Sequence, residues 1–88
     1  MKHIFENDFL SICDLILAEN KSEDEWALIE SDDLFSEGNY EGGYDATEME
    51  FCFGVHINEE EYWFQLTLPE ISLVKNGAIT SVILRPPD

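Results

Sequence analysis

The fold of this chain is decided by residues 49–68, which read MEFCFGVHINEEEYWFQLTL. Apolar residues occupy every second position in both halves of this stretch, and successive side chains of a β-strand point to opposite faces of a sheet. The inward-facing residues are Met49, Phe51, Phe53, Val55, Ile57, Tyr62, Phe64, Leu66 and Leu68. The turn Asn58-Glu59-Glu60 joins the two halves. The pattern therefore predicts a β-hairpin with one face turned toward a hydrophobic core.

Two more apolar segments follow Pro69, at residues 71–75 and 78–84, and they flank Asn76-Gly77. Asn-Gly favours the type I′ turn of a tight hairpin, because both central residues of that turn adopt positive φ. We therefore expect a second hairpin here, ended by Arg-Pro-Pro-Asp at residues 85–88. The main alternative is a helix from Pro69 to Lys75 in place of this hairpin.

The N-terminal part has helical spacing. Apolar residues recur at intervals of three and four, which predicts a helix over Asp8–Glu19. These residues are Phe5, Phe9, Ile12, Cys13, Ile16 and Leu17. We expect Asn7 or Asp8 to cap the start of this helix, and Asn20 to end it in a left-handed conformation.

A second, shorter helix is predicted after Ser22, because Ser22-Glu23-Asp24-Glu25 has the form of a capping box and an apolar run follows it. A short strand over residues 26–30 is the competing interpretation. Residues 31–45 are acidic and contain three glycines, including Gly42-Gly43, which we interpret as a turn. We expect a long loop here. Since fifteen structureless residues are unusual in a compact domain, either residues 33–37 form a helical turn or the loop is functional.

The sequence thus predicts a single α+β domain over residues 1–88, with one or two N-terminal helices packed on a four-stranded antiparallel sheet. Its charge is very uneven. The chain has 20 Asp and Glu residues against 4 Lys and Arg, a formal net charge of −16, and 18 of the acids lie in residues 1–61. Because nonspecific affinity for nucleic acid and for anionic membranes comes from Lys and Arg, we expect no direct binding to either.

Location and chemistry are also constrained. The longest apolar runs are a few residues long, the N-terminus is acidic, and Cys13 and Cys52 show no disulfide pattern, so we expect a cytosolic protein with reduced thiols and no transmembrane helix. Neither a catalytic motif nor calcium-loop spacing occurs. His56 and Cys52 would lie about 13 Å apart along a strand, too far to share a zinc ion. We therefore expect no enzyme, no cofactor and no metal site.

The remaining candidate is a protein-binding surface. Trp63 is predicted on the outward face of the sheet among acids, where an exposed aromatic side chain is typical of an interface anchor, unless a helix or the loop covers it. Tyrosines among the loop acids supply contact area at low entropic cost and make a second patch. The candidate partner-binding residues are Asp32, Asp33, Glu37, Tyr40, Glu41, Tyr44, Asp45, Glu48, Glu50, Glu61 and Trp63.

The amount of charge exceeds what solubility requires. A folded monomer of this mass exposes about 5,300 Å², so a charge of −16 corresponds to about one net charge per 330 Å². A net charge of magnitude about 2 to 8 already keeps a small domain dispersed. In size, net charge and the acidic, aromatic segment Asp32–Tyr44, the chain resembles bacterial immunity proteins, which protect a cell from a toxin. No residue of that class is carried over, because the resemblance includes no alignable motif.

The resemblance implies an inhibitor that occupies the basic active-site cleft of a nuclease-type toxin, as a monomer or a homodimer. Two alternatives remain open. One is a nucleic-acid mimic that inhibits a DNA-binding defence protein of the anti-restriction or anti-CRISPR type. The other is a highly soluble domain without a basic target.

Overall fold

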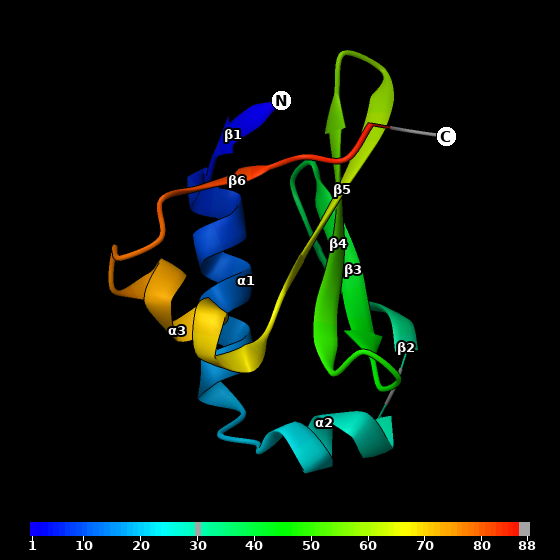
Figure 1. Cartoon of the computed structure of the whole chain (residues 1–88), viewed down its shortest axis with the longest axis vertical. Coiled ribbons are helices and arrows are strands. Elements are labelled where there is room, and N and C mark those ends of the chain that lie inside the picture. Colours follow the sequence, from blue (N-terminus) through cyan, green and yellow to red (C-terminus); the bar gives the residue numbers. More distant parts are fainter. Residues whose placement is uncertain (30, 87–88) are drawn as a thin grey trace.

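The computed structural model describes residues 1–29 and 31–86, and it confirms the α+β class (Figure 1). The elements in this part of the chain are β1 (Lys2–Ile4), α1 (Asn7–Ala18), α2 (Glu23–Ile29), β2 (Ser31–Glu37), β3 (Tyr40–Asp45), β4 (Glu50–Ile57), β5 (Glu60–Leu66), α3 (Leu68–Lys75) and β6 (Ser81–Ile83). The antiparallel sheet has the order β2-β3-β4-β5, and β1 pairs with β6 in a separate two-stranded sheet.

The central hairpin is the predicted one. β4 and β5 pair in register with Phe53 opposite Phe64, and both side chains are buried. The connecting turn consists of Asn58 and Glu59, at φ 51° and 70°, as in a type I′ turn. Glu60 belongs to β5 rather than to the turn.

The long loop predicted over residues 31–45 is wrong, and so is the alternative helical turn over residues 33–37. These residues form the hairpin β2–β3, which turns at Gly38 with φ 58°. Gly42 and Gly43 are strand residues of β3 and not a turn. A Cβ atom on Gly43 would collide with the backbone carbonyl oxygen of Ser31, so β2 and β3 approach each other here only because residue 43 has no side chain.

The predicted second C-terminal hairpin is also wrong, and the alternative helix is confirmed as α3. Thr67 caps α3: its Oγ1 accepts from the Glu70 backbone N–H at 3.4 Å, and the Glu70 carboxylate accepts from the Thr67 N–H at 2.8 Å. Pro69 occupies the first turn, where a missing N–H costs nothing. Gly77, at φ 86°, ends the helix, and its N–H donates to the Val74 carbonyl at 3.1 Å.

The two N-terminal helices agree with the sequence prediction except at one cap. α1 begins after Glu6, and no side chain caps it, so neither Asn7 nor Asp8 has the predicted role. Asn20 has φ 52°, as predicted for the end of the helix. α2 carries the predicted capping box, with Glu25 N–H donating to Ser22 Oγ at 3.2 Å. The competing strand is therefore wrong for residues 26–29, and residue 30 lies outside the described residues.

The end of the described chain extends the sheet instead of simply ending it. Arg85 forms an antiparallel bridge with Trp63 of β5, through N–H···O bonds of 3.1 and 2.8 Å. The preceding residues form β6, which lies beside β1 in Figure 1. The prediction that residues 85–88 stop the sheet thus fails at Arg85, and residues 87–88 lie outside the described part.

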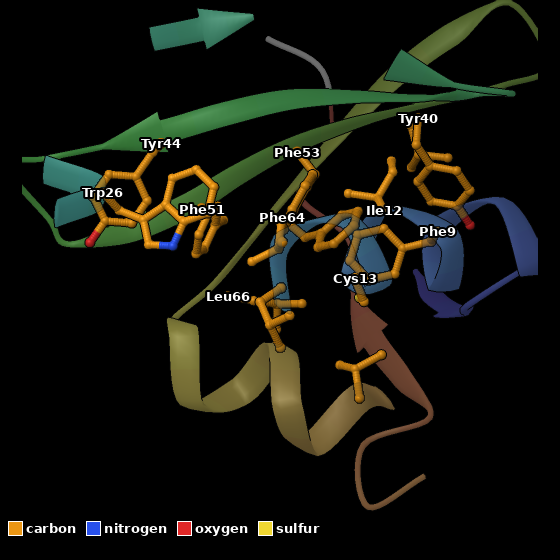
Figure 2. Close-up of a cluster of buried hydrophobic side chains, with 14 of the residues drawn as sticks. Phe9, Ile12, Cys13, Trp26, Tyr40, Tyr44, Phe51, Phe53, Phe64 and Leu66 are labelled. Carbon is orange, nitrogen blue, oxygen red and sulfur yellow. The ribbon is translucent and has the colours of Figure 1, made fainter. Parts of the chain in front are cut away.

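The core lies between the sheet and α1, with α3 packed against α1 (Figure 1). Phe9 of α1 is fully buried, and its ring contacts the rings of Phe53 and Phe64 at centroid distances of 4.9 and 5.3 Å (Figure 2). At the other end of the sheet, Trp26 of α2 packs edge-to-face on Phe51 at 5.1 Å. The helices therefore cover one face of the sheet. We call the opposite face of β3, β4 and β5, together with the part of β2 beside it, the outer face.

The exposed surface measures 5330 Å², close to the area expected for this mass. Within residues 1–29 and 31–86, no helix has the length and apolarity needed to cross a membrane. Cys13 and Cys52 are both free thiols; Cys13 is buried and Cys52 is partly buried.

Candidate functional site: the acidic outer face

The strands that form the outer face carry acids without basic counterparts. Residues 31–66 contain ten carboxylates and neither Lys nor Arg. They are Asp32, Asp33, Glu37, Glu41, Asp45, Glu48, Glu50, Glu59, Glu60 and Glu61. In the described residues, the Lys side chains within 4 Å of a carboxylate are Lys21, beside Glu19, and Lys75, beside Asp14, both away from this sheet. No Lys or Arg of residues 31–66 therefore neutralises the negative charge of the sheet, and the basic side chain that reaches its outer face is Arg85 from the C-terminal segment.

One hollow on the outer face lies beside Trp63. It has a volume of about 220 Å³ and is lined by Asp32, Asp33, Glu41, Gly42 and Trp63, and we call it the Trp63 hollow. The Trp63 side chain is 39% exposed, so neither α2 nor the β2–β3 hairpin covers it. The indole thus stands among three carboxylates with part of its surface open to solvent.

A second hollow lies toward the other end of β4, and we call it the Glu48 hollow. It has a volume of about 380 Å³ and is lined by Asp45, Glu48, Glu50, Cys52, Gln65 and Arg85. Arg85 reaches it from the C-terminal segment, and its Nη2 donates to Gln65 Oε1 at 2.5 Å. Burial, reinforced by Asp45 and Glu50, raises the pKa of the Cys52 thiol, so this thiol is a poor nucleophile at neutral pH.

A third feature of the outer face is a group of three titratable side chains, Glu41 of β3, His56 of β4 and Glu61 of β5. His56 Nε2 lies 3.0 Å from Glu61 Oε2 and 3.4 Å from Glu41 Oε1. The two carboxyl groups are hydrogen-bonded, which raises the pKa of Glu61 and lowers that of Glu41. The sequence predicted both glutamates as partner-binding residues, but it gave no reason to expect that they converge on His56.

Two predicted partner-binding residues are not on the surface. Tyr40 and Tyr44 are each 1% exposed and point into the core (Figure 2). The expectation that they stand between exposed acids is wrong, because β3 alternates and directs its even-numbered residues inward. Glu37 is exposed at the end of β2 and lines neither hollow.

The structure thus brings together eight of the eleven predicted residues on or beside the outer face. They are Asp32, Asp33, Glu41, Asp45, Glu48, Glu50, Glu61 and Trp63. The alternation of residues 61–67 predicts Gln65 on the outward face, although it is not among the candidate partner-binding residues, and the sequence gives no indication that Arg85 belongs to this face. Gln65 follows from the alternation of β5, whereas Arg85 is near only because the chain returns to β5 after β6, a long-range pairing with no local signal in the sequence.

Comparison of the chain with protein-family models, with curated proteins and with solved structures gives no significant match.

Proposed function

We propose that this protein is an inhibitor that binds a basic protein through its outer face, and that its target is a nuclease-type toxin whose active-site cleft the acidic sheet occupies. One observation carries the proposal: residues 31–66 supply ten carboxylates and neither Lys nor Arg. Placing like charges on one sheet lowers the stability of the fold, because the charges repel one another. A positively charged partner surface would relieve this repulsion, and the relief would favour binding.

The Trp63 hollow supplies an anchor for such a surface. A partner's Arg or Lys side chain that enters it would meet the indole face and three carboxylates. A cation over an aromatic ring gains about 0.5 to 2 kcal/mol, and bonds between a cation and a carboxylate are among the stronger hydrogen bonds in proteins. Hot-spot residues at interfaces are enriched in Trp and are surrounded by a polar rim, which is the arrangement found around Trp63.

A nuclease cleft is the kind of target that this chemistry favours. Such a cleft binds the phosphate backbone through Lys and Arg, so a carboxylate-rich face that fills it competes with the nucleic acid. Electrostatic steering raises association rates to about 10⁸ to 10⁹ M⁻¹s⁻¹ at low salt. An inhibitor that must act before a toxin cleaves its substrate benefits from fast association.

The test compares two triple variants that each remove three negative charges. The face variant is Asp32→Asn, Asp33→Asn and Glu48→Gln. The control variant is Asp14→Asn, Glu19→Gln and Asp24→Asn, three exposed acids that lie on α1, directly after α1 and on α2. Each protein is immobilised and exposed to native lysate at about 0.1 M salt, and retained proteins are identified after elution at about 1 M salt. The captured partner is then purified for measurements of association rate and nuclease activity.

We expect wild type and control to retain one stoichiometric basic protein, and the face variant to bind it at least about tenfold more slowly. Trp63→Ala should raise the Kd about 30-fold, equivalent to about 2 kcal/mol. Stoichiometric addition of wild type should abolish the partner's nuclease activity. Equal slowing by the two triple variants would mean that net charge alone governs binding. A bound partner whose activity is unaffected would exclude the inhibitor role, and binding of several DNA-binding proteins in competition with DNA would indicate a nucleic-acid mimic instead.

A further inference from the structure

We infer that Glu41, His56 and Glu61 form a binding site for a divalent first-row transition metal ion of the zinc type. The imidazole nitrogen and the two carboxylate oxygens lie within 4.8 Å of one another. They come from three neighbouring strands, β3, β4 and β5, of one sheet. This inference does not depend on the proposed inhibitor function.

The separations of the His56 nitrogen from the two carboxylate oxygens lie at or slightly below those of a tetrahedral zinc site. Zinc–nitrogen and zinc–oxygen bonds are about 2.0 to 2.2 Å, so two ligand atoms of a tetrahedral site lie about 3.3 to 3.6 Å apart. His56 Nε2 lies 3.0 Å from Glu61 Oε2 and 3.4 Å from Glu41 Oε1. Small movements of the exposed Glu41 and His56 side chains and of the half-buried Glu61 would bring this arrangement to coordination geometry.

The backbone holds the three residues in place. His56 and Glu61 are directly opposite each other in the β4–β5 ladder, and Glu41 lies opposite Gly54 in the β3–β4 ladder. Gly54 stands between the two glutamates, and a Cβ atom there would lie 3.1 Å from Glu61 Cδ. The missing side chain at Gly54 therefore gives Glu61 room to lean toward Glu41 and His56.

The chemistry of the three groups selects the type of ion. Mg²⁺ and Ca²⁺ prefer all-oxygen sites with six or more ligands, whereas zinc accepts imidazole together with carboxylate at coordination number four. A neutral imidazole Nε2 donates to one carboxylate at most, so it cannot satisfy both glutamates. A dication would contact all three groups, balance the two negative charges, and keep one position for water.

The experiment is a calorimetric titration of the full chain with ZnCl₂ at about 0.15 M NaCl, in the presence of millimolar MgCl₂ to occupy nonspecific carboxylates. His56→Gln and Glu61→Gln each remove one ligand. Glu60→Gln is the matched control, because it removes the same charge from the neighbouring residue and is not one of the three ligands. Circular dichroism of each variant checks that it is folded.

We expect wild type to bind one zinc ion. His56→Gln and Glu61→Gln should each raise the Kd at least tenfold, and Glu60→Gln should change it less than twofold. Zinc should also shift the NMR signals of the His56 imidazole and leave those of His3 unchanged. The inference is overturned if Glu60→Gln and Glu61→Gln weaken binding equally, which would show mere accumulation of cations on an acidic surface, or if magnesium abolishes zinc binding.

Discussion

Tyr40 and Tyr44 of β3 allow a test of which buried hydrogen bonds stabilise the fold. Both side chains are 1% exposed, but their hydroxyl groups have different partners. The Tyr40 hydroxyl lies 2.5 Å from His3 Nε2, accepts from the Glu6 backbone N–H and donates to the Glu6 carboxylate at 3.4 Å. The Tyr44 hydroxyl has one weak partner, the sulfur of Met49 at 3.8 Å. Replacing each tyrosine by Phe preserves the ring and removes only these polar contacts.

The expected losses of stability follow from those contacts. Tyr40→Phe leaves the buried His3 nitrogen without its partner, and an unsatisfied buried polar group costs about 1 to 3 kcal/mol. Tyr44→Phe removes a weak bond and should cost less than about 0.5 kcal/mol. A domain of 88 residues has a total stability of about 4 to 13 kcal/mol, so the first loss is a large fraction and the second is small. In thermal unfolding, Tyr40→Phe should lower the Tm by about 4 to 20 °C.

The assay is urea unfolding at pH 7.5, followed by the fluorescence of Trp26 and Trp63 and by circular dichroism. A double-mutant cycle with His3→Gln measures the coupling between His3 and Tyr40, which we expect to be about 1 kcal/mol or more. Equal losses in Tyr40→Phe and Tyr44→Phe, or a coupling below about 0.3 kcal/mol, would refute the assignment of the His3–Tyr40–Glu6 network.

The same network makes stability depend on pH. Burial lowers the pKa of His3 below its usual 6.5, and the Glu6 carboxylate opposes this only in part. Well above pH 6.5 the imidazole is neutral in both the folded and the unfolded chain. As the pH falls below 6.5, the unfolded chain takes up a proton that the folded chain does not, so the free energy of unfolding decreases. The stability of wild type relative to His3→Gln should therefore decrease between pH 7.5 and 5.5, and a constant difference would contradict the argument.

Two further predictions concern backbone geometry, each measured by urea unfolding. Gly43→Ala should destabilise the protein by about 1 to 3 kcal/mol, because the new Cβ meets the Ser31 carbonyl of a neighbouring strand, whereas Gly54→Ala, which meets only the flexible Glu61 side chain, should cost less. Glu59→Gly should stabilise it by about 1 kcal/mol, because Glu59 has φ 70°, where a side chain is strained. Glu59→Gln removes the same charge without relieving that strain, so a gain as large as that of Glu59→Gly would assign the effect to charge.

The sequence predicts those helices and strands in which apolar side chains recur at the helical or strand interval without interruption. Residues 49–68 alternate over nearly their whole length, and the apolar positions of α1 recur without interruption, so hairpin and helix were both identified. The β2–β3 hairpin was missed because two strand positions of β3 are Gly42 and Gly43, which carry no side chain to show alternation. The available signal was Gly38-Asn39, a two-residue turn between extended segments.

The C-terminal hairpin is wrongly predicted because the dipeptide Asn76-Gly77 is compatible both with a hairpin turn and with the end of a helix. Asn76-Gly77 favours a type I′ hairpin, but glycine is also the preferred residue just after a helix, where positive φ is needed. Thr67 and Glu70, spaced as a capping box around Pro69, decide in favour of the helix, although Leu68 continues the alternation of the preceding strand. The composition of the outer face was predictable from alternation, but the approach of Arg85 and the meeting of Glu41 with Glu61 depend on strand register, which no local pattern encodes.

The placement of the acids argues against solubility as their sole purpose. Solubility depends mainly on net charge, and acids spread evenly over 5330 Å² would repel one another less than an arrangement that places ten of the 20 acids in residues 31–66 with neither Lys nor Arg. Lys21 and Lys75 lie beside acids of the helical layer, while the sheet acids of residues 31–66 are left without a basic neighbour in their own segment. Part of this repulsion lies around the half-exposed Trp63, which stands beside Asp32, Asp33 and Glu41. Under the proposed function, this negative face and its partly exposed indole would receive long basic side chains of the partner, which an even distribution of the same sixteen net charges would not favour.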